Sequence, residues 1–465
     1  MMPIAEVVNS YRMRLFLVSS IFLVSGLTAC GESSTDDANT AKAWRTPQLI
    51  SFANGNGQSP QIGMDANGNA IVVMFDYQGG YGIFATHYFK NSGLWLSAPV
   101  PLMDNVRPSV DIKDWQIAVA PNGNAVSVRR QVDQSNNYHI WATHYNYITR
   151  SWSTEAYVQR DVNAPIGTMP RAAIDNSKAV AVWVDGPVNT ASIRANTYSS
   201  TSGWNATTTE IDDKDMNAGT ADFVDIAMAS NGEAYVVMQQ VDTSGNKSIY
   251  FNRYIYISNS WDTASLVDGL TGEADYPKIA IDGNNNAISI WRQVNGSETN
   301  LYASYRPEGG NWEAQVAIEA LTGGIDIDPV IVMNSSGTAF AAWIQADGTT
   351  NSVYANRYTP TGGWETAQLL ETGNNIARHV DVAVDSNGNA FAVWSQYSTN
   401  DFRIYRNQYT VDSGWDTAEL MENSAGKEAY LPKVVFDNSG NAIAVWGLLD
   451  PAAGNVSKVW ASRYQ

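Results

Sequence analysis

The segment PKIAIDGNNNAISIW, residues 277–291, decides the fold, because close copies of it recur along the chain. Each copy has an alternating apolar stretch, a polar turn, and a second apolar stretch that opens with alanine. That alanine falls at Ala70, Ala125, Ala179, Ala234, Ala287, Ala339, Ala390 and Ala442. Successive copies are 51 to 55 residues apart, so we infer eight internal repeats.

Each repeat is typical of four short strands separated by turns. The first two strands are the apolar stretches just described, as in residues 60–64 and 391–394. A third strand follows, as in 353–358, and a fourth begins with tryptophan, as in 363–369. Four strands at this period, repeated around an axis, predict an all-β, eight-bladed β-propeller of four-stranded blades.

The two ends of the repeat region predict how the ring closes. The eighth copy stops after its third strand, at residues 459–464. The missing fourth strand is found at the other end, where Trp44–Leu49 matches the segment that begins at Trp364. We therefore expect the N-terminal strand to complete the last blade, so that residues 44–465 form one domain without an open sheet edge.

Tryptophan follows the repeat, which indicates packing between blades rather than ligand binding. Fifteen of the sixteen fall in three columns: Trp44, Trp95, Trp152, Trp204, Trp261, Trp312, Trp364 and Trp415 in the fourth strand, Trp183, Trp291, Trp343, Trp394 and Trp446 ending the second, and Trp141 and Trp460 in the third. Trp115 alone lies outside these columns.

Composition excludes several classes of protein. The chain has 465 residues, a net charge of −18 and 11% aromatic residues, so it is neither disordered nor suited to binding nucleic acid. Its single cysteine excludes a disulfide framework and a Cys-rich zinc site. The turns between first and second strands, such as Asp65–Asn69, offer one carboxylate each, which favours structural turns over calcium sites. We expect no metal and no cofactor.

The N-terminus predicts secretion and a lipid anchor. Residues 15–27 form an apolar run behind Arg14 that is too short to span a bilayer, as in a signal peptide. The run ends in Leu27-Thr28-Ala29-Cys30, which resembles the lipobox of bacterial lipoproteins. The resemblance implies a signal peptide at 1–29, lipidation of Cys30 and membrane attachment, and Gly31 favours the outer membrane. Residues 30–43 are predicted to be a flexible tether, and either Met1 or Met13 is the start.

One face of the ring carries the beginnings of the first strands and the ends of the second strands. A column of polar residues there alternates in charge between neighbouring blades. Its charged members are Arg171, Asp225, Lys278, Asp381 and Lys433. Two interpretations stay open for them: ion pairs between blades, or a polar ligand site near the axis of the ring.

Blades 1 and 2 depart from the repeat on this same face. The unusual residues are Tyr77 and Tyr81 between the second and third strands of blade 1, Arg107, Asp111 and Trp115 before and within the first strand of blade 2, and Arg129 and Arg130 in place of a tryptophan. Exposed aromatic rings beside arginine and aspartate suit a sugar or a peptide. The alternative is that Arg129 pairs internally with a carboxylate such as Asp76 or Asp111.

No catalytic motif accompanies the repeat, and we expect a monomeric binding or scaffold protein of the bacterial cell envelope rather than an enzyme. Its ligand would be an envelope protein or a glycan. Lipobox, tether and eight blades resemble the propeller lipoprotein of the outer-membrane barrel-assembly machine, which implies a scaffold role involving a loop such as Gly447–Pro451. The polar turns loosely resemble the Asp-box of sialidase propellers, and a glycoside hydrolase or sialidase-like enzyme is the alternative.

Overall fold

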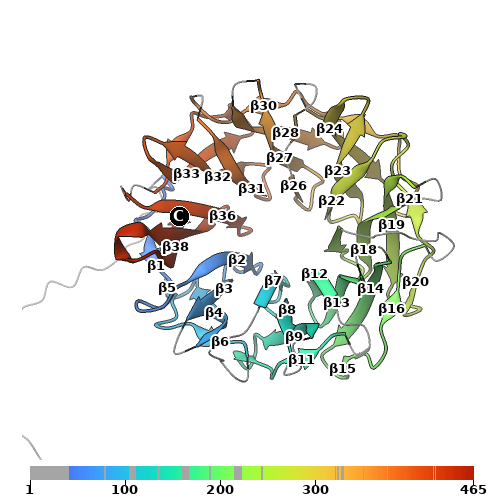
Figure 1. Cartoon of the computed structure of the whole chain (residues 1–465), viewed down its shortest axis with the longest axis horizontal. Helices are drawn as coiled ribbons and strands as arrows, with labels where there is room; N and C mark the ends of the chain where they lie inside the picture. The colour runs from blue at the N-terminus through green and yellow to red at the C-terminus, as the bar shows by residue number, and fades with distance from the viewer. Residues whose placement is uncertain are drawn as a thin grey trace, which may run out of the picture. The chain divides into compact units, whose positions relative to one another are not determined.

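The computed structural model describes residues 41–465, except 78–79, 104–111, 134–136, 160–166, 188–189, 214–222, 242–244, 320, 322–323, 326–328, 349, 374, 423 and 425. The predicted signal peptide and Cys30 lie outside these residues. Lys42–Gln465 forms one compact unit, in which eight antiparallel sheets are arranged in a ring around a central axis (Figure 1). The predicted eight-bladed propeller is confirmed. Within the described chain, no helix has the length and apolar character needed to cross a membrane.

Each blade has three long strands, numbered here from the central axis outward. The inner strands are β2 (Gln58–Met64), β7 (Ile112–Val119), β12 (Gly167–Asp175), β17 (Val224–Met228), β22 (Ala274–Ile281), β26 (Val330–Met333), β31 (Ala377–Val384) and β36 (Glu428–Phe436). The second strands are β3 (Ala70–Tyr77), β8 (Ala125–Val132), β13 (Lys178–Asp185), β18 (Ala234–Val241), β23 (Ala287–Asn295), β27 (Ala339–Ala346), β32 (Ala390–Ser398) and β37 (Ala442–Asp450). The third strands are β4 (Tyr81–Phe89), β9 (Tyr138–Asn146), β14 (Ser192–Ser199), β19 (Lys247–Ile255), β24 (Glu298–Arg306), β28 (Asn351–Thr359), β33 (Asp401–Thr410) and β38 (Val456–Tyr464).

The outer strand differs from the prediction, because two-residue pieces replace a continuous strand. They are β5 (Leu94–Trp95), β6 (Val100–Pro101), β10 (Ser151–Trp152), β11 (Ala156–Tyr157), β15 (Gly203–Trp204), β16 (Thr209–Glu210), β20 (Ser260–Trp261), β21 (Ser265–Leu266), β25 (Val316–Ala317), β29 (Gly363–Trp364), β30 (Gln368–Leu369), β34 (Gly414–Trp415) and β35 (Glu419–Leu420). Short, interrupted edge strands offer a poor template for pairing with another chain.

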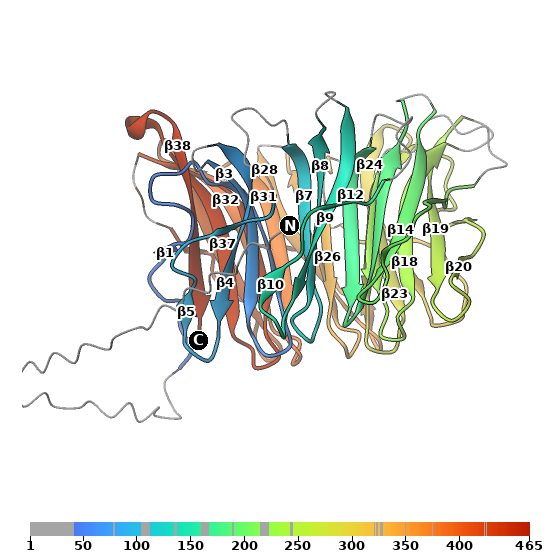
Figure 2. The same cartoon turned by 90° about the horizontal axis from the view of Figure 1, so that it is seen from below.

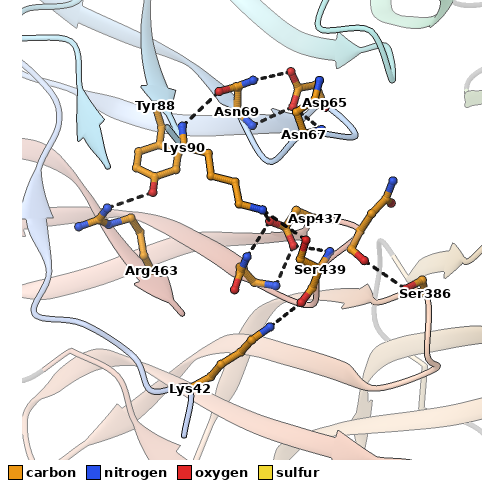
Figure 3. A network of polar contacts seen from close by, with 12 residues as sticks. Lys42, Asp65, Asn67, Asn69, Tyr88, Lys90, Ser386, Asp437, Ser439 and Arg463 are labelled. Atoms are coloured by element: carbon orange, nitrogen blue, oxygen red, sulfur yellow. Dashed lines mark hydrogen bonds and ion pairs between the residues drawn. The ribbon is translucent and has the colours of Figure 1, made fainter. Parts of the chain in front are cut away.

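The N-terminal strand completes the eighth blade, as the sequence predicts. Strand β1 (Gln48–Leu49) pairs antiparallel with β38, and Trp44 bridges Tyr464. Figure 3 shows the polar contacts around this closure. The ammonium of Lys90 donates to Asp437 at 2.7 Å, and the guanidinium of Arg463 donates to the Tyr88 hydroxyl at 3.1 Å. Backbone pairing thus ties the N-terminal segment into blade 8, and side-chain contacts join blade 8 to blade 1.

The core is divided among the junctions between blades. Eight buried hydrophobic clusters each draw on two neighbouring sheets, and the one that joins blades 8 and 1 contains Ile50, Val72 and Val445. The five tryptophans that end the second strands are fully buried, which confirms their packing role. Each blade is therefore stabilised by both of its neighbours rather than by a core of its own.

We call the face where inner strands begin the upper face and the face with the turns between first and second strands the lower face. The upper face lies at the top of Figure 2, where the 3₁₀ helix η1 (Pro451–Ala453) projects from blade 8. Near the upper face, six inner strands contain a β-bulge with a positive-φ residue. These residues are Ser59, Asp114, Met169, Tyr276, His379 and Leu431. A bulge bends its strand and increases the local twist, so the first residues of these six strands depart from the regular register.

Candidate functional site

The polar turns of the lower face are structural, as predicted. In Asp65, Oδ1 accepts hydrogen bonds from the backbone N–H groups of Asn67 and Asn69, at 2.9 and 2.8 Å. Asp282, Asp385 and Asp437 repeat this arrangement. Each carboxylate is thus occupied by its own turn. Among the residues that the structure describes, no three metal-ligating side chains gather closely enough to hold a metal ion.

The charged column lies between blades and bonds one blade to the next. Asp381 accepts from Lys433 at 3.3 Å and from the backbone N–H of Val434 at 2.9 Å. Asp225 accepts from the N–H of Ile279 at 3.0 Å. Burial raises the pKa of Asp225, while the charges of Lys278 and Arg171 oppose that shift. These contacts favour the interpretation as inter-blade ion pairs over an axial ligand site.

Arg129 must be removed from the candidate binding residues. Its side chain is 0% exposed, and its guanidinium bonds Gln131 at 2.8 Å, Thr143 at 3.1 Å and the carboxylate of Glu155. A ligand cannot reach a group that is buried and saturated with acceptors. The internal pairing expected as the alternative exists, but its carboxylate is Glu155. Asp76 instead accepts the N–H groups of Phe52, Asn56 and Tyr77, and Asp111 lies outside the described residues, as does Arg107.

Four aromatic side chains form a continuous row on the upper face of blades 1 and 2, which we call the aromatic platform: Tyr77, Tyr81, Phe75 and Trp115. Phe75 stacks between Tyr81 and Trp115, with ring centroids 5.4 and 5.9 Å away, and Tyr77 meets Tyr81 edge-on at 5.0 Å. The indole N–H of Trp115 donates to the Ser59 carbonyl at 3.0 Å. Tyr77 and Tyr81 remain 41% and 36% exposed. The sequence located three of these four rings.

A polar group adjoins the platform in blade 2. The guanidinium of Arg130 stacks on the Tyr138 ring at 3.9 Å and lies 3.5 Å from the carboxylate of Asp114. Asp114 occupies the bulge of β7 and is exposed, and Lys113 beside it lies 5.8 Å from the same tyrosine ring. The exposed tyrosines of blade 1 and this charged group of blade 2 therefore lie in neighbouring blades near the upper face.

The blade 8 loop does not offer the apolar surface that a scaffold role implies. Leu448 is buried in the cluster between blades 7 and 8, and Gly447 faces the ring of Tyr430. A Cβ at Gly447 would lie 2.5 Å from that ring, so this position admits only glycine without rearrangement. Leu448 stands where the other seven blades have glutamine or aspartate, and its burial shows that it serves packing.

A column of acids that the sequence did not reveal follows the outer strands of blades 3 to 7. Asp212, Asp268, Glu371 and Glu422 are buried, and Glu319 is half-buried. Two of them bond the glutamine near the end of the second strand of the next blade: Gln293 donates to Asp268 at 3.1 Å, and Gln396 donates to Glu371. In blade 2 the roles are exchanged, since Gln159 donates to Asp185 at 2.7 Å. The sequence signal that could have revealed these pairs is the recurrence, in successive repeats, of an acid after the outer strand and a glutamine near the end of the next second strand.

Burial raises the pKa of two of these acids well above the usual range of carboxyl groups. It raises the pKa of Glu371 to about 7, assisted by the charge of Asp347, and the pKa of Asp212 to about 6. For Glu371 the folded-state pKa lies above the unfolded value, so protonation stabilises the fold. That contribution is complete below about pH 4.5 and is lost as the pH rises through 7.

We therefore expect Glu371→Gln to stabilise the protein at pH 8 and to change little at pH 4.5. One pKa unit corresponds to about 1.4 kcal/mol, so the advantage at pH 8 should reach a few kcal/mol. Urea denaturation of both proteins across this pH range measures it. Glu298→Gln, at an exposed position, is the control. A constant difference between Glu371→Gln and the parent at every pH would contradict the assignment.

Comparison with known proteins assigns the chain to no family. No protein-family model matches the chain, and no curated protein does. A solved structure of an ulvan lyase, described as a new polysaccharide lyase family, is 10% identical over 89% of this chain and 95% of its own, with a TM-score of 0.49. The NanB sialidase from Streptococcus pneumoniae is 10% identical over 76% and 68%, at 0.43. A protein of unknown function from Dyadobacter fermentans is 8% identical over 91% and 99%, at 0.45.

These matches correct the prediction that the protein is not an enzyme. A polysaccharide lyase and a sialidase are among the structures that resemble it, so the fold gives no reason to exclude catalysis. At such identities the likeness concerns the ring alone and assigns neither a reaction nor a site to this chain.

Proposed function

We propose that this protein recognises a glycan of the cell envelope at the aromatic platform, and that Cys30 anchors it to the outer membrane. The observation that carries the proposal is the stacked row of rings with two exposed tyrosines at its end. Tyr77 and Tyr81 lie in edge-on contact, and Phe75 and Trp115 support them from below the surface. Such a surface offers flat apolar area for a sugar ring without rearrangement.

The neighbouring polar groups supply the directional contacts that a saccharide needs. Arg130 offers guanidinium N–H donors, and the exposed carboxylate of Asp114 accepts from hydroxyl groups. Both lie on blade 2, near the end of the strand that carries Trp115, and an extended glycan that stacks on the tyrosines would use them as its polar contacts. A few polar groups beside an apolar surface are the usual composition of a small-molecule site.

Replacing Tyr77 and Tyr81 with alanine should weaken glycan binding at least tenfold and leave the melting temperature nearly unchanged, because both rings are partly exposed. A tenfold loss corresponds to about 1.4 kcal/mol, a reasonable value for one lost stacking contact. A glycan array followed by calorimetry on the hits measures the change, and each hit is also assayed for cleavage products.

Tyr256→Ala provides the matched control, since this tyrosine is 36% exposed but lies after β19 on the lower face. Binding that survives the double replacement, or that Tyr256→Ala lowers equally, would place the glycan elsewhere. A silent array together with a stoichiometric envelope protein recovered by crosslinking would favour the scaffold alternative.

The anchor has its own test. Intact-mass spectrometry of the protein purified from native membranes should find a chain that begins at Cys30 and carries acyl groups. Because several acyl chains bind a bilayer far more firmly than one, the protein should remain with the membrane after a salt wash. Cys30→Ser should release it, and an unmodified Cys30 in the native protein would refute the anchor.

A further inference from the structure

A cleft of about 560 Å³ opens at the outer rim between blades 3 and 4, far around the ring from the aromatic platform (Figure 1, near β16 and β20). Residues 209–213 of blade 3 form one wall, and Asn252 with residues 259–264 of blade 4 form the other. Its volume falls within the range of about 300–1,000 Å³ that small-molecule sites occupy.

Asn252 lacks a hydrogen bond that its counterparts in other blades make. The amide groups of Asn196, Asn356 and Asn407 each donate to two carbonyls, one in the preceding blade and one in their own outer strand. Asn252 donates only to the Ile211 carbonyl of blade 3, at 2.6 Å. Its side chain is 2% exposed and lines the cleft, so its second amide hydrogen has no acceptor among the described residues.

Asp212 presents the complementary group on the opposite wall. It is 6% exposed, and its carboxylate is bonded by the Ser192 side chain and the backbone of Ile193. Its Oδ1 atom still has no hydrogen-bond donor within the described part of the chain. A buried donor and a buried acceptor, one from each blade, thus border the same cavity with a bond unmade. An unmade hydrogen bond of a buried group costs about 1–3 kcal/mol, so both favour a ligand with hydroxyl groups, which donate and accept at once.

The remaining walls argue against an anionic ligand. Glu210 and Asp262 at the rim are already paired with Arg194 and Arg253, at 3.4 and 2.9 Å. The described lining contains four carboxylates and neither lysine nor arginine, so an anionic ligand would be repelled. The indole of Trp261 adds an aromatic surface, held by Tyr254 at a centroid distance of 5.5 Å.

We propose that the cleft between blades 3 and 4 is a second site, separate from the platform, for a neutral saccharide of one or two rings. Asn252 donates to one ring oxygen or hydroxyl, Asp212 accepts from another, and Trp261 covers an apolar face of the sugar.

The repeat supplies a test with a matched control. Thr263 is exposed at the cleft, and Thr366 occupies the same position of the outer strand in blade 6. Thr263→Trp should fill the cleft without touching the buried groups, whereas Thr366→Trp adds the same bulk elsewhere. Ligand-observed NMR with glucose, galactose, N-acetylglucosamine, cellobiose and lactose should show binding that Thr263→Trp weakens at least tenfold and that Thr366→Trp leaves intact.

The platform variant separates this site from the proposed function. Binding of these neutral sugars should persist when Tyr77 and Tyr81 are alanine, and glycan binding at the platform should persist in Thr263→Trp. The inference is overturned if none of the five sugars binds, if Thr263→Trp leaves their binding unchanged, or if an amine such as spermidine occupies the cleft in their place.

Discussion

A chain that lacks residues 44–50 should fail to form a stable ring and should aggregate. The deletion removes β1 and with it the backbone bonds from Arg45 to Arg463 and from Ile50 to Val459, at 2.7 and 2.9 Å. It also removes Ile50 from the cluster between blades 8 and 1 and Trp44 from its contact with Phe391 at 5.0 Å. Strand β38 then becomes an exposed edge, which is a template for association with another chain.

Circular dichroism, thermal melting and size-exclusion chromatography measure the outcome. A chain that begins at Lys42 keeps the whole closure and is the control, and it should melt like the full-length protein. The milder variant Trp44→Ala should retain the fold but lower the melting temperature, because it removes the ring's contacts with Phe391, Tyr464 and Arg406 and leaves the backbone pairing of β1 in place. A deletion variant that melts unchanged would show that the eighth blade closes without β1.

Arg129→Ala should destabilise the protein by about 3–5 kcal/mol, the usual effect of removing one partner from a buried ion pair. The substitution leaves the carboxylate of Glu155 without its cation. It also leaves the side-chain oxygens of Gln131 and Thr143 without the N–H groups that now donate to them. Denaturant unfolding of the variant and the parent measures the loss. Glycan binding, measured at a temperature where the variant is folded, should be unchanged, because Arg129 does not reach the surface.

The other blades indicate how to reverse this loss. In blades 5, 6 and 7 a tryptophan occupies this position, and its indole N–H donates to the following glutamine at 3.0–3.1 Å, as Nε of Arg129 does to Gln131. Alanine stands at the position of Glu155 in four other blades, at Ala98, Ala264, Ala367 and Ala418. The double variant Arg129→Trp with Glu155→Ala should therefore regain most of the stability. A double variant no more stable than Arg129→Ala would contradict this exchange.

The architecture could be predicted from the sequence because the same packing residues recur at the same positions in the eight repeats. The shared alanines, the buried tryptophans and the match of Trp44–Leu49 to other outer strands all survive in the structure. What the repeat could not show is the internal division of the outer strands. Two two-residue strands, such as β29 and β30, have the same pattern of apolar residues as the single short strand expected over residues 363–369.

The site was harder to predict because residues of the same type serve different purposes. Arg129 and Arg130 are adjacent, yet one is fully buried and the other stacks on Tyr138 near the surface, since neighbouring residues of a strand face opposite sides. The cleft between blades 3 and 4 left no mark in the sequence. Asn252 is the same residue type as its counterparts Asn196, Asn356 and Asn407, and it differs from them only in the hydrogen bond that its amide does not make.

The closure places the two ends of the ring in direct contact, since Ala43 and Gln465 exchange backbone hydrogen bonds of 3.2 and 3.3 Å. A short peptide can therefore join these ends, and the chain can be opened at another connection between blades. Circularly permuted versions should then adopt the same ring, each interrupted in a different blade. The blade in which the chain begins is thus set by the gene, and the closed ring does not require the chain to begin in any particular blade.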